Sequence, residues 1–174
     1  MVSFTTKVAG ATALLAGAVS AQNFRVVAEP GWRTWYGDGN MYVGARIPES
    51  LENTLNYTIP DWSGTAPQVL IGPVAPATTD DLPEGTFVAI NNATGATDPV
   101  LFTNDESALG PDYISRWLRW GLFMIPQAPT GGPSPTETHF YLGETEEPNT
   151  FIVTWRTPGT PDGGLTRVNL TAVL

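Results

Sequence analysis

Short apolar runs recur along the chain, separated every few positions by glycine, proline or polar residues. Within several runs apolar and polar residues alternate with a period of two. This alternation predicts β-strands with one face toward a core, and the frequent turn residues predict that the strands are short. The predicted strands are Phe24–Ala28, Asn40–Ile47, Leu55–Ile59, Val69–Gly72, Thr86–Asn91, Val100–Thr103, Trp117–Ile125, Thr138–Leu142, Thr150–Arg156 and Thr166–Val173.

Turn signals mark where several of these strands begin or end. Asp38-Gly39 predicts a tight hairpin turn directly before the second predicted strand. Pro-Asp-Gly-Gly at 161–164 predicts a turn between the last two strands, and Gly121 predicts a bend in the strand that contains it. The side chains predicted to point inward are Leu55, Tyr57, Ile59, Phe151, Val153, Trp155, Val168, Leu170 and Ala172.

Two short segments have helical character. Pro48–Asn53 and Pro111–Ser115 each place a proline and acidic residues in a first turn, so we predict a short helix at each. The proline-rich stretch 126–135 is predicted to be an exposed loop, because proline donates no hydrogen bond to a sheet. The pattern predicts an all-β, single-domain antiparallel β-sandwich of jelly-roll or immunoglobulin-like type, with at most one or two short helices.

The first 21 residues have the pattern of a secretory signal peptide. Lys7 precedes an apolar run at Val8–Val19, and the small residues at 19–21 form a cleavage site that leaves Gln22 first. The run is shorter than the roughly 20 residues that a membrane-spanning helix needs. We therefore expect a mature domain over 22–174 that is secreted, extracellular or cell-wall associated, with no membrane insertion.

The expected mature chain is acidic and lacks cysteine. The sequence has a formal charge of −9, and removing Lys7 with the signal leaves −10. Such a surface repels nucleic acid, so we expect no nucleic-acid partner. Without cysteine, the core must be stabilised by packing of its aromatic and aliphatic side chains.

Three asparagines begin Asn-x-Thr sequons, namely Asn56, Asn92 and Asn169. In a secreted protein such asparagines are N-glycosylation acceptors, and a glycosylated position must face water. We therefore predict a glycoprotein with these three asparagines as its glycosylation sites.

Several catalytic chemistries lack their residues in this sequence. The only histidine, His139, lies in a predicted strand, and the chain has neither cysteine nor a Gly-x-Ser-x-Gly motif, so we expect no hydrolytic triad. One histidine also makes an ordinary zinc or copper centre implausible, and we expect no metal and no cofactor. The remaining catalytic chemistry is that of paired carboxylates, which glycosidases use. The candidate acids at strand ends are Glu29, Asp38, Asp61, Asp105 and Asp112.

Two aromatic groups are candidates for a ligand site, because flat rings beside polar side chains bind the C–H faces of sugars. Trp32, Trp35 and Tyr36 lie in a segment that we interpret as a loop. Trp117 and Arg119 share one face of a predicted strand, and we expect that face at the surface. The opposite face, which we expect in the core, carries Leu118, Trp120 and Leu122.

These residues predict a secreted, non-catalytic binding or cell-surface protein that recognises a glycan or cell-wall component through exposed aromatic rings. Its expected partner is a polysaccharide or an extracellular protein. One alternative is a cofactor-independent enzyme, either a carboxylate glycosidase or an isomerase with a β-lined pocket. Another is a structural or host-interacting protein without a small ligand, for which a large exposed apolar patch would be the sign.

Overall fold

The frequent glycines and prolines are reflected in short strands joined by tight turns. The computed structural model describes residues 23–60, 62, 68–128 and 138–174, and the expected signal peptide lies outside them. Within these residues no segment is an α-helix, and one 3-10 helix, η1, covers Glu106–Ala108. The strands are β1 (Asn23–Ala28), β2 (Trp32–Gly37), β3 (Asn40–Gly44), β4 (Thr54–Leu55), β5 (Tyr57–Pro60), β6 (Gly72–Pro73), β7 (Phe87–Asn91), β8 (Leu101–Thr103), β9 (Tyr113–Ile114), β10 (Trp117–Trp120), β11 (Phe123–Pro126), β12 (Phe140–Glu144), β13 (Thr150–Trp155), β14 (Thr166–Val168) and β15 (Leu170–Val173).

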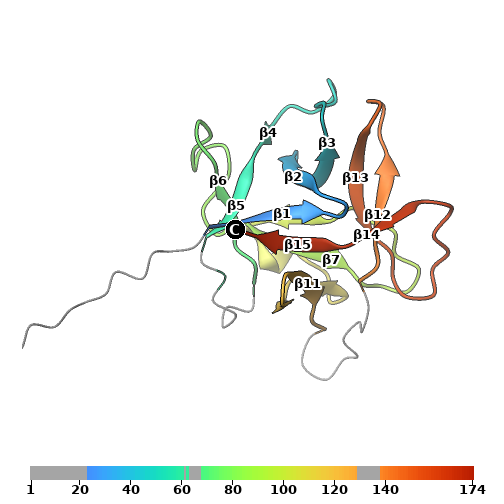
Figure 1. Ribbon diagram of the computed structural model, residues 1–174. Helices are drawn as coiled ribbons and strands as arrows, with labels where there is room; N and C mark the ends of the chain where they lie inside the picture. Colours follow the sequence, from blue (N-terminus) through green and yellow to red (C-terminus); the bar gives the residue numbers. More distant parts are fainter. Residues whose placement is uncertain (1–22, 61, 63–67, 129–137) are drawn as a thin grey trace, which may run out of the picture.

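Fifteen strands are joined by hydrogen bonds in one antiparallel sheet, with the main order β10-β11-β15-β1-β2-β3-β13-β12-β14. A second route returns to β1, because β3 pairs with β8, β8 with β7, and β5 with both β6 and β1. A bridge from Leu70 to Phe87 connects the segment before β6 to β7. The sheet is therefore nearly closed into a barrel-like shape (Figure 1). The predicted single-domain, antiparallel all-β fold is confirmed.

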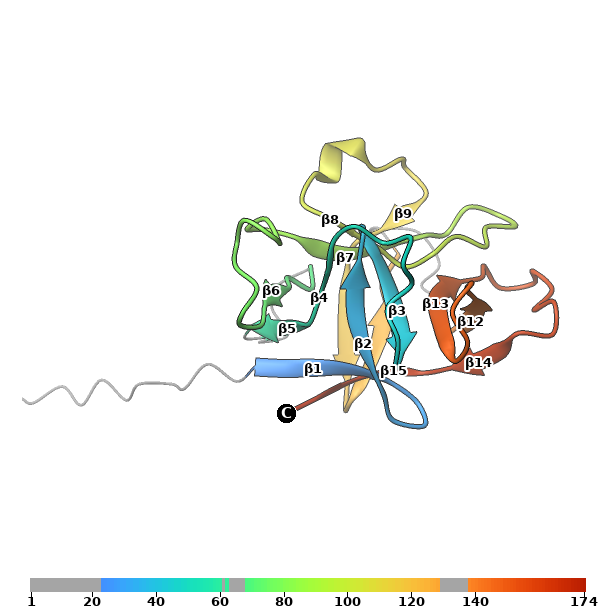
Figure 2. The same ribbon diagram turned by 90° about the horizontal axis from the view of Figure 1, so that it is seen from above.

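Viewed from above, the β2–β3 hairpin stands between two groups of strands (Figure 2). Strands β12, β13 and β14 lie on one side of it, and β4, β5 and β6 lie on the other. The hairpin therefore separates these two groups of strands. Its outer face is bordered by the segment that follows β3 and by β4–β5, and this arrangement positions the candidate site.

One apolar core fills the space inside the curled sheet. Trp155, Phe140 and Tyr57 are almost completely buried at its centre. The predicted alternation is confirmed in β5, β14 and β15, whose inward positions are buried, whereas Phe151 in β13 is only half-buried. Burying a large apolar side chain contributes roughly 1.5–3 kcal/mol, and the described chain has no disulfide to add to this packing.

The segment that contains Trp32 and Trp35 is strand β2, so its interpretation as a loop is wrong. β2 and β3 form a hairpin around Asp38-Gly39, whose φ angles are 43° and 83°. A two-residue type I′ turn requires positive φ at both positions. The turn was correctly recognised in the sequence, but such a turn implies a strand on each of its sides.

Both short helices predicted from the sequence are wrong. Pro48–Asn53 forms turns, with the Leu51 N–H donating to the Pro48 carbonyl over 3.2 Å. In the other segment, Tyr113–Ile114 is β9 and pairs with β7. A helix one turn long has too few internal hydrogen bonds to offset the entropy of ordering it, so the cap-like residues make turns instead.

Several predicted strand boundaries also differ. The strand from Asn40 ends at Gly44, whose φ is +135° and where an added Cβ would lie 2.5 Å from the Asn149 carbonyl oxygen. The strand from Thr166 divides at Asn169 into β14 and β15, which pair with different neighbours. Of Val69–Gly72, only Gly72 belongs to a strand, although Leu70 makes an isolated bridge. Of the predicted loop at 126–135, residue 126 ends β11 and 129–135 lie outside the described residues.

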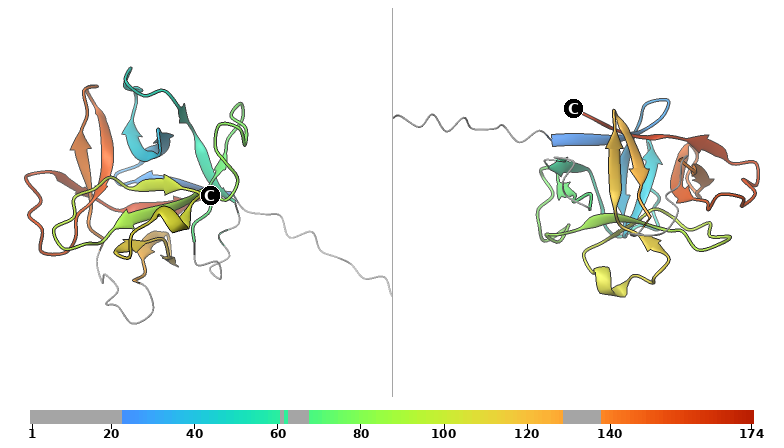
Figure 3. Two further views of the ribbon diagram at one scale, coloured as in Figure 1. Left: turned by 180° about the vertical axis from the view of Figure 1, so that it is seen from behind. Right: turned by 90° about the horizontal axis from the view of Figure 1, so that it is seen from below.

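Trp117–Ile125 is a hairpin of two strands instead of one bent strand. β10 and β11 pair from Trp117 with Pro126 to Trp120 with Phe123, and Gly121 and Leu122 form the turn between them. Gly121 has a φ of +62°, as the first central residue of a type II′ turn requires. β10 is the last strand on the main path of the sheet, and the hairpin faces the viewer in the right-hand view of Figure 3.

Candidate functional site

The five aromatic and arginine residues predicted to bind a ligand do not form one cluster. Trp32, Trp35 and Tyr36 lie on β2, whereas Trp117 and Arg119 lie on β10. In the sheet order β11, β15 and β1 lie between these two strands. Each group must therefore be judged by its own surroundings.

Trp117 belongs to the core, so the expectation that this side chain lies at the surface is wrong. The side chain is only 3% exposed, and its indole N–H donates to the Val88 carbonyl over 2.8 Å. Its ring stacks on that of Phe140, with centroids 6.1 Å apart. Arg119 follows on the same face, and its guanidinium lies over the Phe24 ring, 4.6 Å from the centroid. Arg119 is exposed, as expected, but with Trp117 buried the pair offers no aromatic platform.

The opposite face of the hairpin, which we expected in the core, is exposed. Trp120 is 72% exposed, and its cross-strand partner Phe123 is 40% exposed. Leu118 and Leu122 are exposed beside them. Arg119 marked the face of Trp117 as the outer one, but its guanidinium lies over the Phe24 ring, and the position of the hairpin at the end of the sheet leaves the apolar face of Trp120 exposed.

The residues of β2 divide between the two faces of the strand. Thr34 and Tyr36 point inward, and the Tyr36 ring lies 5.5 Å from that of Phe102. Arg33 and Trp35 share the outer face. Trp35 is 8% exposed and stacks on Tyr42, with ring centroids 4.8 Å apart and planes inclined by 15°. Tyr36 is therefore a packing residue, whereas Trp35 shows only an edge to solvent.

Trp32 is the exposed ring of this group. It is 40% exposed and stacks on Phe151, with centroids 5.5 Å apart and planes inclined by 15°. Phe151 is itself packed against the core. The stacked neighbour holds the Trp32 indole in one orientation, so a ligand that contacts it would cost little side-chain entropy.

Three hollows that share lining residues lie along β2, and we call them together the β2 groove. The first lies beside Trp35 and has a volume of about 240 Å³. The second, of about 530 Å³, is lined by Trp32 and Arg33 and shares Gly44 and Ala45 with the first. The third, of about 410 Å³, shares Arg33 with the second. The second and third hollows fall within the size range of small-molecule sites.

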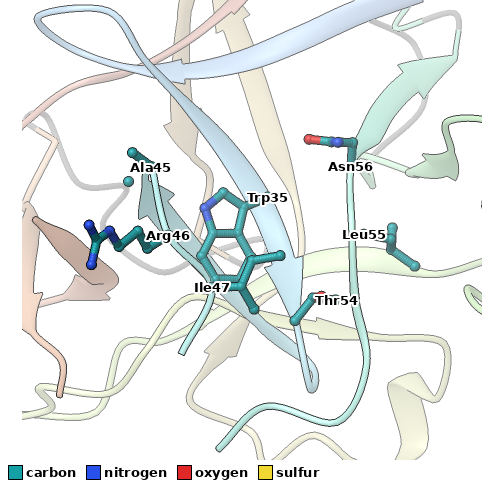
Figure 4. A pocket seen from close by; sticks show the side chains of 8 residues that line it. Trp35, Ala45, Arg46, Ile47, Thr54, Leu55 and Asn56 are labelled. Carbon is teal, nitrogen blue, oxygen red and sulfur yellow. The ribbon is translucent and has the colours of Figure 1, made fainter. Parts of the chain in front are cut away.

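The ends of the groove differ in chemistry. In the first hollow the Trp35 indole lies between the segments 45–47 and 54–56, and the Asn56 carboxamide extends toward its side (Figure 4). The Arg46 guanidinium points away from the indole (Figure 4). The third hollow combines polar residues with apolar ones, and its lining is Asn23, Arg25, Arg33, Thr58, Val74 and the C-terminal Leu174.

Sequence reasoning missed Arg25, Arg33 and Thr58 as candidates. Arg25 stands between the buried Phe24 and Val26 in β1, so alternation alone places it on the outer face. Arg33 stands between Trp32 and Thr34, but the loop interpretation of this segment hid its direction. Thr58 follows the inward Tyr57 in β5 in the same way.

No aspartate or glutamate lines any of the three hollows. They therefore offer no carboxylate pair for glycoside hydrolysis. Two of the candidate acids hold turns instead: Asp38 accepts from the Glu52 and Asn53 N–H groups, and Asp105 accepts from Ser107. The hydrogen bonds from Ser107 lower the pKa of Asp105, whereas a general acid needs a raised one.

The other candidate catalytic residues are dispersed. Glu29 accepts a hydrogen bond from Asn169, Asp112 is exposed, and Asp61 lies outside the described residues. The His139 ring lies edge-on to Trp155, with centroids 5.8 Å apart. Among the described residues, no group of three or more His, Cys, Asp or Glu side chains is arranged to hold a metal ion. No helix in the described part of the chain is long and apolar enough to cross a membrane.

The three sequons differ in accessibility. Asn56 is exposed, and its carboxamide makes no hydrogen bond to another described residue. The Asn92 side-chain oxygen is buried without a hydrogen-bond partner in the described chain. The Asn169 amide donates to Glu29 over 2.8 Å and accepts from the Thr138 hydroxyl over 2.7 Å. A glycan attaches through the amide nitrogen, so Asn56 is the sequon whose side chain is best placed to carry one.

Comparison of the chain with protein-family models, with curated proteins and with solved structures found no match.

Proposed function

We propose that this protein is a secreted, non-catalytic binding protein that recognises an extracellular glycan in the β2 groove. The observation that carries the proposal is the Trp32 ring, exposed and held by Phe151 at the edge of a hollow of about 530 Å³. An indole face packs well against the C–H face of a sugar ring. Arg33 and Asn149 line the same hollow and can donate hydrogen bonds to sugar hydroxyls.

Secretion and glycosylation belong to the same proposal. The signal-like N-terminus directs the chain to the secretory pathway, where Asn56 becomes the glycosylated residue. The Asn56 side chain lines the first hollow, so a glycan there borders the groove. The second hollow, which Trp32 lines, is the proposed binding site beside this glycan.

The test is co-sedimentation of the purified protein with insoluble chitin, β-glucan, cellulose and mannan at mildly acidic and neutral pH. Replacing an aromatic anchor at the centre of a site costs about 2 kcal/mol or more, so we expect W32A to weaken retention by roughly thirtyfold. W120A, compared with the wild type at concentrations at which both are monomeric, is the matched control, because it removes an exposed tryptophan outside the groove. Unchanged retention of W32A on every polymer that binds the wild type would contradict the proposal.

A second candidate function, self-assembly, is favoured by the exposed apolar face of the β10–β11 hairpin. β10 ends the main path of the sheet, so part of its backbone is free to pair. We propose that two copies meet there antiparallel, as a two-fold axis requires. Sedimentation velocity tests this: a concentration-dependent dimer that W120S abolishes supports it, and a monomer at all concentrations contradicts it.

A further inference from the structure

The third hollow of the β2 groove contains two arginines whose positions are fixed by strand register. Arg33 on β2 lies opposite Val27 on β1. Arg25 is two residues from Val27 and therefore on the same face. Diagonal neighbours of this kind in an antiparallel pair lie about 7–8 Å apart. Both side chains line the hollow together.

Neither arginine forms an ion pair in the described part of the protein. No aspartate or glutamate of that part lines the hollow, and the carboxylate of the C-terminal Leu174, which also lines it, pairs with neither guanidinium. The whole chain has 17 acidic residues against 8 basic ones. Two free guanidinium groups side by side are therefore a local positive site on an acidic protein, and like charges so placed repel unless an anion lies between them.

The polar neighbours of the pair are suited to a sugar. The Thr58 hydroxyl donates to the Phe24 carbonyl over 2.8 Å, so its oxygen is left to accept a hydrogen bond from a ligand hydroxyl. Asn23 is exposed beside it and can donate as well as accept. A ligand with both hydroxyl groups and an anionic group would satisfy the polar side chains of the hollow.

We propose that Arg25 and Arg33 bind the carboxylate or sulfate group of an acidic saccharide, while a neighbouring sugar of the same chain packs on Trp32. This inference rests on the proposed glycan-binding function. Arg33 lines both the hollow of Trp32 and that of Arg25, so it joins the stacking surface to the anion site. A guanidinium binds carboxylate or sulfate through two parallel hydrogen bonds, which gives geometric selectivity over neutral sugars.

Titration calorimetry on the mature protein tests the inference with three oligosaccharides of equal length. They are an oligogalacturonate, the same oligomer fully methyl-esterified, and a sulfated oligosaccharide. We expect at least roughly tenfold tighter binding of an anionic oligomer than of the neutral ester, because charge-assisted hydrogen bonds are about twice as strong as neutral ones. Preference between the carboxylate and sulfate forms identifies the anion, and raised salt should weaken only the anionic complexes.

Single substitutions assign the effect to the pair. R25Q and R33Q should each weaken anionic binding by roughly tenfold and bring it near that of the ester. R116Q is the matched control, because Arg116 is exposed outside the groove and its replacement changes the net charge equally. W32A should weaken binding of acidic and neutral oligomers alike.

The outcomes separate the two proposals. Equal affinity for the acidic and esterified oligomers, with both lost in W32A, overturns the arginine assignment and leaves glycan binding standing. An equal loss in R25Q, R33Q and R116Q also overturns it, since only net charge would then matter. No binding of any saccharide overturns both proposals.

Discussion

Trp117 and Trp120 have opposite surroundings in one hairpin, and replacing each by phenylalanine gives a sharp contrast. In W117F, the hydrogen bond from the indole to Val88 is lost, which costs about 0.5–1.5 kcal/mol. Removing about two buried ring carbons costs roughly 1.5 kcal/mol more. The expected loss in the free energy of unfolding is therefore about 2–3 kcal/mol.

Trp120 is 72% exposed, and substitutions at such positions change stability by less than about 0.5 kcal/mol. For a chain of this size each kcal/mol shifts the melting temperature by roughly 2–4 °C. W117F should therefore melt roughly 5–10 °C below the wild type, and W120F within about 2 °C of it.

Urea and thermal unfolding followed by far-ultraviolet circular dichroism measure both variants, because tryptophan fluorescence would itself change with the substitutions. The alternation in the sequence alone predicts the reverse order, with Trp120 in the core and Trp117 outside. Equal destabilisation by the two changes, or a larger effect at Trp120, would refute the burial of Trp117 and the uncovered face of the hairpin.

Three further predictions concern single groups. Burial raises the pKa of the Tyr57 hydroxyl, so as pH rises this tyrosine ionises in the unfolded chain before it ionises in the folded protein. The free energy of unfolding should therefore fall as pH rises above about 10. Urea unfolding at several pH values should show a smaller decrease in Y57F than in the wild type. In the secreted protein N56Q should lose the mass of a glycan in mass spectrometry, whereas a mass loss in N169Q would contradict our ranking of these sequons. Asp105 should titrate below the ordinary aspartate pKa of 3.8 in carboxyl NMR, and S107A should raise its midpoint, since Ser107 hydrogen bonds lower it.

Much of the fold could be predicted because buried and exposed side chains alternate with a period of two along several strands. Where one face of a strand is apolar and the other polar, as at Val168 and Leu170 around Asn169, the inward side chains were identified correctly. The alternation fails at β10. Arg119 marks the face of Trp117 as the outer one, but the position of the strand at the end of the sheet buries Trp117 and leaves Trp120 exposed.

The candidate site was predicted less well, because the prediction relied on aromatic residues and omitted the polar residues beside them. Trp32 was identified, but Trp35 and Tyr36 are largely used in packing, and Trp117 is in the core. The first hollow depends on how the segment after β3 lies against β4 and Asn56, and no local sequence pattern contains such a long-range arrangement. Arg33 could have been found by taking the Asp38-Gly39 turn as the end of a strand.

The β2 groove and the core are coupled by the register of the β1–β2–β3 strands. The alternation that buries Phe24 and Val26 is the same alternation that turns Arg25 outward, and Arg33 faces it because Val27 lies opposite. A slip of one residue would exchange the two faces and place a guanidinium in the core. The energy of burying the core therefore also fixes the positions of the two arginines. This energy offsets the repulsion between the two guanidinium groups, so the groove needs no disulfide or metal to hold them close together. A preorganised anion site of this kind is expected to bind without rearrangement of the backbone.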